Sequence, residues 1–219
     1  MDAARLYESC EPQRDELAYF MRRLYERGLT TCSGGNLSMR IESGHVLITP
    51  SGVDKGRITA SQIALLTPEG ENLTPHLTAS IETGMHLAVL HARPDVNGVV
   101  HAHPVVVTSF SCMDEEIEYR LVGETYVVLG VPAVARYFMG GTAELAAEVS
   151  KKAQDAEVIV MKNHGVLTVG PTLLKAFDRI EVLEAAAQMT ALTRLVGKLV
   201  TLRPEDLAAL EVRFGLRKK

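Results

Sequence analysis

Short apolar runs alternate with helix-like segments along most of this 219-residue chain, and tight turns separate several of the runs. Short turns join antiparallel strands, whereas parallel strands need crossover connections of a dozen or more residues. The alternation predicts an α/β fold of the α+β type, with a mixed or mainly antiparallel sheet covered by helices. A doubly wound dinucleotide fold is not expected, since the sequence contains neither a GxGxxG turn opening a helix nor a GxxxxGK[ST] phosphate loop.

Hydrophobic spacing and turn residues define the expected elements. Helices are expected over residues 13–28, 59–65, 80–92, 142–154 and 171–196, with a short one after Pro204; strands are expected over 37–41, 45–48, 98–103, 126–130, 157–161 and 166–169. On the helix that Ser80 caps, we expect Ile81, Met85 and Val89 to face inward. The length suits one core, and we expect one domain that spans residues 1–219.

Charge and cysteine content limit the partners and the compartment. The net charge is −4, which gives no reason to expect a nucleic-acid or acidic-membrane partner. The apolar runs are much shorter than the roughly 20 residues that cross a bilayer. Cys10, Cys32 and Cys112 are odd in number and widely spaced, which argues against a disulfide framework and fits a reducing compartment. We therefore expect a cytoplasmic protein.

The strongest chemical signal is the pair His101 and His103. Residues two apart on a strand point to the same face, so both imidazoles project together. Apolar residues before and after the pair predict burial, and buried imidazoles need polar partners, which a metal supplies. Zinc in catalytic sites takes three protein ligands and keeps a fourth position open. The pair therefore predicts part of a metal site.

Two further residues have both an ordinary and a functional interpretation. His164 follows an apolar run and precedes Gly165, where the backbone can turn, but taken alone it is better explained as an ordinary loop histidine. Glu82 near a helix start is favoured by the helix dipole, and its functional interpretation is a general base beside the metal. His86 and His91 are expected to be structural or exposed residues on one helix face.

Six segments together resemble the class II aldolase/adducin head family, which includes the L-fuculose-1-phosphate aldolases. They are Ser33-Gly34-Gly35-Asn36-Leu37-Ser38, Ile48-Thr49-Pro50-Ser51-Gly52, Ser80-Ile81-Glu82, Arg93-Pro94-Asp95, His101-Ala102-His103 and Asn163-His164-Gly165. The resemblance runs from about residue 12 to the C-terminus. It implies a three-layer sandwich with a central, mainly antiparallel sheet flanked by helices. It also implies a homotetramer with active sites at subunit interfaces.

The resemblance also implies a site and a reaction. His101, His103 and His164 would bind Zn²⁺, although three imidazoles also suit Mn²⁺ or Co²⁺. Glu82 would be the acid/base residue and a fourth metal ligand. A sugar phosphate would be held through its phosphate by Gly35, Asn36, Ser51, Gly52, Ser80 and Ile81. The implied reaction is reversible aldol cleavage of an L-fuculose-1-phosphate-like ketose 1-phosphate to dihydroxyacetone phosphate and an aldehyde, through a metal-stabilised enediolate.

The sequence departs from the family's aldolases at two tyrosines, because Val122 and Phe214 align with them. A gap would restore Tyr119 or Tyr126 as a proton donor, and Glu124 is another candidate because related dehydratases use a glutamate there. Other reactions in the family are methylthioribulose-1-phosphate dehydration, ribulose-phosphate 4-epimerisation and decarboxylation of small acids. A non-enzymatic alternative is an adducin-head-like interaction module, although such heads lack the metal histidines.

Overall fold

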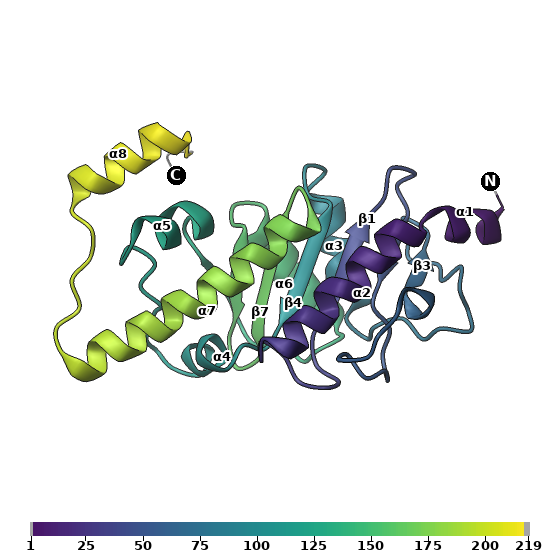
Figure 1. Ribbon diagram of the computed structural model, residues 1–219, viewed down its shortest axis with the longest axis horizontal. Coiled ribbons are helices and arrows are strands. Elements are labelled where there is room, and N and C mark those ends of the chain that lie inside the picture. The colour runs from purple at the N-terminus through teal and green to yellow at the C-terminus, as the bar shows by residue number, and fades with distance from the viewer. Residues whose placement is uncertain (1, 217–219) are drawn as a thin grey trace.

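The computed structural model describes residues 2–216, in which helices cover both faces of one seven-stranded sheet (Figure 1). The strands are β1 (Asn36–Arg40), β2 (Val46–Ile48), β3 (Ala64–Leu66), β4 (Gly98–Ala102), β5 (Ala133–Ala135), β6 (Val158–Met161) and β7 (Gly165–Gly170). Their order is β3-β2-β1-β4-β7-β6-β5. Neighbouring strands are antiparallel except for the parallel pair β5 and β6. The predicted α/β fold with a mainly antiparallel sheet is confirmed.

The helices form the two outer layers. They are α1 (Ala3–Ser9), α2 (Glu11–Glu26), the 3-10 turn η1 (Ala60–Gln62), α3 (Thr83–Ala92), α4 (Val105–Ser111), α5 (Gly123–Leu129), α6 (Ala143–Ala153), α7 (Leu173–Val196) and α8 (Pro204–Phe214). On β4, Val100 and Ala102 pack in the core formed with α2 and α7, whereas Val99 packs with α3 and α6. Alternate strand residues thus supply two cores, one on each face of the sheet, and the three layers agree with the predicted sandwich (Figure 1).

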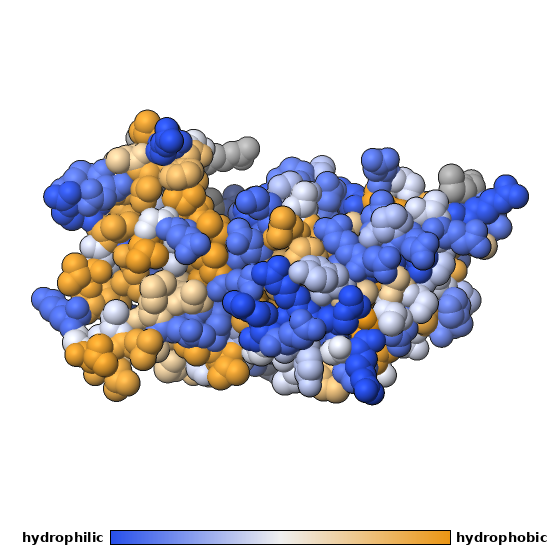
Figure 2. Space-filling view, viewed as in Figure 1, coloured by the Kyte–Doolittle hydropathy of each residue, from blue (hydrophilic) through white to orange (hydrophobic). Residues whose placement is uncertain are grey.

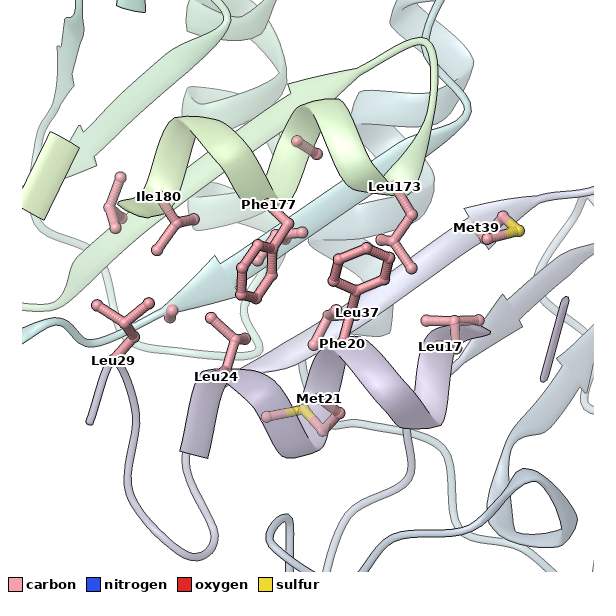
Figure 3. Packing of buried hydrophobic residues seen from close by; sticks show 14 of the residues in the cluster. Leu17, Phe20, Met21, Leu24, Leu29, Leu37, Met39, Leu173, Phe177 and Ile180 are labelled. Carbon is pink, nitrogen blue, oxygen red and sulfur yellow. The ribbon is translucent and has the colours of Figure 1, made fainter. Parts of the chain in front are cut away.

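The core between α2, α7 and the sheet is wholly apolar in its centre (Figure 3). The Phe20 and Phe177 rings lie with centroids 4.9 Å apart, and Leu17, Leu24 and Leu37 are fully buried around them. Burying each such side chain contributes about 1.5–3 kcal/mol. This core supports β1 and β4 from one side, and their opposite face carries the candidate site.

Three sequence expectations are corrected. Residues 126–130 are not a strand but belong to α5: the Thr125 hydroxyl accepts the Val122 N–H at 3.4 Å at the start of this helix, and the buried Thr125 and Leu129 lie four residues apart on one side of it. Residues 59–65 are not a helix, because Ala64–Leu66 pairs with β2 as strand β3 and leaves only the turn η1. Ile81 is 74% exposed and precedes α3, so it does not face inward. The sequence did not predict α1, α4 or β5.

The last turn of α7 and the chain that follows it form a C-terminal arm, which we define as residues 192–216. It turns back through an extended segment to α8, which packs on α5 (Figure 1). The Tyr126 hydroxyl donates a hydrogen bond of 2.6 Å to Glu211 and so links the two helices. Exposed apolar side chains gather on the arm (Figure 2), namely Leu192, Leu195, Val196, Val200, Val212 and Phe214. Within residues 2–216, no helix is long and apolar enough to cross a membrane.

Candidate metal centre

Three histidines from two parts of the chain meet at one end of the sheet. His101 lies on β4, His103 follows that strand, and His164 lies in the turn between β6 and β7. Their ring centroids are 4.6 Å (101 to 103), 4.9 Å (101 to 164) and 5.4 Å (103 to 164) apart. One nitrogen from each ring lies within 4.8 Å of the others. The trio could hold a metal ion.

Two glycines allow the backbone to approach His103 closely. A Cβ added to Gly165 would lie 2.5 Å from His103 Cδ2, and one added to Gly34 would lie 3.1 Å from His103 Nδ1. Such contacts are too short for a larger residue without movement of the ring. The preceding turn also bends sharply, since Asn163 adopts a left-handed φ of 53°. These local conformations bring His164 back towards β4.

Glu82 caps the start of α3 and faces the trio. Its Oε2 lies 3.2 Å from His101 Nε2, and its Oε1 lies 3.2 Å from His164 Nε2. Adjacent ligand atoms around tetrahedral zinc are separated by about 3.3–3.6 Å, given zinc–ligand distances of about 2.0–2.2 Å. The carboxylate therefore lies close to where a fourth ligand would lie.

An unpaired nitrogen supports a cation at this position. His101 Nδ1 lies 2.9 Å from the carbonyl oxygen of Val166, and because a carbonyl only accepts, Nδ1 carries the proton. Nε2 then presents a lone pair, is buried, and has no hydrogen-bond partner among residues 2–216. Two electron-pair donors, this nitrogen and the Glu82 carboxylate, thus face one another. Imidazole and carboxylate donors suit zinc, and they also suit manganese or cobalt.

Burial and neighbouring charge act in opposite directions on Glu82. Burial raises the pKa of this carboxyl, but its contacts with His101, His164 and the Asn36 amide lower it by more, so the net pKa lies well below its usual value. Burial is the main cause that lowers the pKa of His103 to about 3. His103 is thus neutral near pH 7, which is the form that binds metal.

The predicted phosphate loops lie side by side and lead to Glu82. An isolated β-bridge joins Pro50 to Ala79, and the Ser51 N–H donates to the Thr78 carbonyl at 2.9 Å. The Ser80 hydroxyl oxygen accepts the Glu82 N–H at 3.3 Å. Because the Ser51 amide is already used, its hydroxyl is the group that remains for a ligand.

The other candidate phosphate residues differ in exposure. Gly52 is exposed and has a left-handed φ of 72°, whereas Gly35 is buried with a φ of 67°. Ile81 is exposed beside them. The Asn36 side chain is buried and donates from Nδ2 to Glu82 Oε2 at 2.8 Å. Its amide therefore interacts with the acid/base candidate, and its backbone lies opposite His101 in the pairing of β1 with β4.

Sequence reasoning missed Lys55, which ties the loops together. Its side chain is 2% exposed, its Nζ donates to the Pro50 carbonyl at 2.5 Å, and its backbone N–H donates to the Cys32 carbonyl at 2.9 Å. Burial lowers the pKa of Lys55 to about 8. None of the ion pairs found between residues 2 and 216 includes it. A lysine in a polar segment gives no sequence signal for burial.

Sequence reasoning also missed Gly140. A Cβ added there would lie 3.6 Å from Glu82 Oε1 and 3.9 Å from His164 Cε1, so this backbone lies directly against the site. The Gly140-Gly141 pair before the helix cap Thr142 was the available signal.

The candidate proton donors are held elsewhere in this chain. The Tyr119 and Tyr126 rings stack with centroids 6.1 Å apart, and the hydrogen bond to Glu211 raises the pKa of Tyr126 to about 12. Glu124 and Val122 are exposed at the start of α5, and Phe214 is exposed at the end of α8. These contacts connect the donors to α5 and the C-terminal arm, not to the histidine trio.

Comparison with known proteins identifies relatives with two chemistries. The family model described as "Class II Aldolase and Adducin N-terminal domain" matches residues 15–191. An L-fuculose phosphate aldolase of Methanocaldococcus jannaschii is 34% identical over 177 residues, covering 81% of this chain and 94% of the relative. A 3-oxo-tetronate 4-phosphate decarboxylase of Haemophilus influenzae is 33% identical over 181 residues, covering 81% and 86%.

Solved structures agree with these matches. An L-fuculose 1-phosphate aldolase superposes with a TM-score of 0.84 at 30% identity and covers 93% of this chain and 96% of its own. Another, from Thermus thermophilus, has a TM-score of 0.73 at 28% identity and covers 82% and 93%. The identities to aldolase and decarboxylase are nearly equal, so similarity alone does not choose between the two reactions.

Proposed function

The chain belongs to the class II aldolase and adducin family, and from this membership we propose that it is a zinc-dependent lyase that reversibly cleaves a ketose 1-phosphate into dihydroxyacetone phosphate and an aldehyde. The proposal rests on His101, His103 and His164 meeting Glu82 around the unpaired nitrogen of His101. The three histidines would hold a divalent metal, which would supply Lewis-acid stabilisation of negative charge on the substrate's carbonyl oxygen. Manganese or cobalt would suit the same donors.

Glu82 is proposed to move the proton at the reacting carbon. Its lowered pKa keeps it a carboxylate, which is the form that removes a proton from dihydroxyacetone phosphate in the condensation direction. In the cleavage direction the resulting carboxylic acid returns a proton to the same carbon. The Asn36 amide holds Oε2 at 2.8 Å and so fixes the carboxylate's orientation.

We propose that the phosphate binds across the loops beside Glu82. The Ser51 and Ser80 hydroxyls and the backbone at Gly35, Gly52 and Ile81 offer neutral donors, which suit phosphate oxygens, and Asn36 would complete this set at the start of β1. The buried ammonium of Lys55 donates to the Pro50 carbonyl beside Ser51, where it adds positive charge to the loop.

Decarboxylation of a keto-acid phosphate is the second candidate, favoured by the 33% identical decarboxylase relative. Both reactions leave negative charge beside the same type of carbonyl. Aldol cleavage also needs a proton donor or acceptor at the aldehyde oxygen, and valine and phenylalanine align with the family's tyrosines at Val122 and Phe214. Decarboxylation does not need that group.

One assay separates the candidates. The zinc-loaded protein would be given a panel of ketose 1-phosphates with detection of dihydroxyacetone phosphate, and in parallel 3-oxo-tetronate 4-phosphate with detection of carbon dioxide. Triose phosphate from any ketose supports the aldolase. Carbon dioxide without triose phosphate would replace it with the decarboxylase, and the absence of both products would contradict the two proposals.

We further propose a homotetramer with active sites at subunit interfaces. The exposed apolar side chains of the C-terminal arm support it, since such patches are typical of protein contacts (Figure 2). Light scattering should give a mass about four times the 23.9 kDa of one chain, and a monomer mass would contradict the proposal. The three cysteines are unpaired, which supports a reducing compartment such as the cytoplasm.

A further inference from the structure

Buried polar side chains continue from Glu82 into the layer between the sheet and α3. Asn36 on β1 is 5% exposed, and His86 on α3 and Ser38 on β1 are both 0% exposed. Asn36 Nδ2 lies 2.8 Å from Glu82 Oε2, His86 Nε2 lies 2.6 Å from Asn36 Oδ1, and Ser38 Oγ lies 2.7 Å from His86 Nδ1. The four side chains thus form one continuous hydrogen-bond chain, which runs from Glu82 through Asn36 and His86 to Ser38.

The ionised state of Glu82 fixes which group donates and which accepts in each hydrogen bond of this chain. An ionised carboxylate only accepts hydrogen bonds, so the Asn36 amide must turn its NH₂ group towards Glu82. Its carbonyl oxygen then faces His86, and Nε2 must carry the ring proton. Nδ1 is left as an acceptor, and the Ser38 hydroxyl donates to it. One tautomer of His86 satisfies all three contacts.

We propose that His86 is a positioning residue of the site: held by Ser38 as the Nε2–H tautomer, it locks the Asn36 amide so that an N–H group faces Glu82. A flipped amide would place its carbonyl oxygen against the carboxylate and would leave two acceptors in contact. The inference rests on the proposed role of Glu82 and deepens it, since it explains how the carboxylate keeps one orientation.

The position of His86 fits this role. It lies four residues after Glu82 on the same helix, so one helix face carries both the carboxylate and the group that orients its donor. Its buried neighbours on α3 are the apolar Met85, Val89 and Leu90. A fully buried imidazole among such residues is costly unless both nitrogens are paired, and here both are.

The test compares His86→Leu, which removes both ring hydrogen bonds, with His86→Gln, which keeps a donor and an acceptor. The matched control is Thr168→Val: Thr168 is also 0% exposed, but its hydroxyl donates to Ala176 on α7, in the other core. We expect His86→Leu to lower kcat about 10–100-fold with little change in KM, as typical for a residue that orients a ligand group. His86→Gln should recover most of the loss, and Thr168→Val should keep wild-type kcat.

Zinc affinity tests the inference without any turnover. His86→Leu should weaken zinc binding in the wild-type background but not further in a Glu82→Gln background, because the effect passes through Glu82. Equal weakening in both backgrounds would overturn the inference, as would wild-type kcat in His86→Leu. An inactive wild-type protein would contradict the lyase proposal alone and leave the zinc measurement decisive for His86.

Nuclear magnetic resonance of ¹⁵N-histidine-labelled protein gives an independent reading that needs no variant to fold. The His86 ring should show one proton, on Nε2. A ring protonated on Nδ1 only, or on both nitrogens, would contradict the proposed assignment of donors and acceptors in the hydrogen-bond chain.

Discussion

The histidine site and the C-terminal arm leave different kinds of groups without a partner in the described chain. At the site, the buried His101 Nε2 has no hydrogen-bond partner, although the Glu82 carboxylate is only 3.2 Å away. On the arm, α8 buries none of its residues, and Leu195 and Val212 are more than 80% exposed. The first pattern suits a bound cation, and the second suits contact with an apolar surface. We therefore expect perturbations of the two regions to have separable effects.

Metal removal should have the largest effect, and it should be confined to the site. A bound divalent ion contributes several kcal/mol to stabilising transition-state charge, so chelation should lower turnover by on the order of 10³-fold or more. Dialysis against a chelator, followed by activity assays before and after zinc is restored, measures this. The oligomeric mass should stay constant. Full activity in metal-free protein would remove the site from the mechanism.

Replacement of Glu82, the acid/base candidate, should have the next largest effect on turnover. Glu82→Gln should lower kcat by about 10²–10⁴-fold, since the amide cannot take or return a proton, and zinc should stay bound to the three histidines. The matched control is Glu124→Gln at the start of α5, which lies outside the trio's contacts within this chain. A larger loss of kcat in Glu124→Gln than in Glu82→Gln would contradict this prediction and would favour a dehydratase-like reaction with Glu124 at the substrate.

A charge introduced on the arm should weaken the association of subunits. Leu195→Asp places a carboxylate where we expect apolar contact, and losing burial of a leucine costs about 1.5–3 kcal/mol, or about 10–100-fold in association. Light scattering over a concentration series measures the shift to smaller species. Lys175→Asp, at the exposed start of the same helix, should leave the mass unchanged. An unchanged mass in Leu195→Asp would exclude this part of the arm from the interface.

The same contrast explains what could be predicted from the sequence. The strands and long helices followed from periodicity, because strands such as β4 bury both faces and α7 carries a continuous apolar side. His101 and His103 followed from strand geometry, but His164 needed the resemblance, since a turn's path depends on contacts distant in sequence. His86 was expected to be structural or exposed, and the hydrogen bonds that join it to Glu82 depend on β1 packing against α3, which are distant in sequence. Residues 126–130 were mistaken for a strand because their β-branched residues outweighed a cap made by Thr125.

Lys55→Met should have a smaller effect, on binding alone. If its buried ammonium attracts the phosphate, its loss should raise KM and the inhibition constant of inorganic phosphate about tenfold, and kcat should change little. The neighbouring control is Arg57→Met, whose exposed side chain should leave both constants unchanged. Unchanged phosphate inhibition in Lys55→Met would limit this lysine to holding the Pro50 turn.

The smallest effect concerns the free energy of unfolding of the metal-free protein, which should depend on pH in opposite ways at the histidine site and at the C-terminal arm. Burial is the main cause that lowers the pKa of both His86 and His103 to about 3. The unfolded chain takes up these protons from about pH 6.5 downward and the folded chain does not, so the free energy of unfolding should fall as the pH drops below 6.5. The loss is at most about 1.4 kcal/mol per pH unit for each histidine. At the hydrogen bond between Tyr126 and the arm the pH dependence has the opposite sign. The pKa of Tyr126 is raised to about 12, so its contribution to the free energy of unfolding is lost as the pH rises above 10.

Urea titrations at pH 7.5, 6.5 and 5.5 in the presence of a chelator measure the loss of stability on the acid side, and His86→Gln should reduce the slope of that loss. A free energy of unfolding that stays constant across this range would contradict the burial of neutral imidazoles on which the comparison depends.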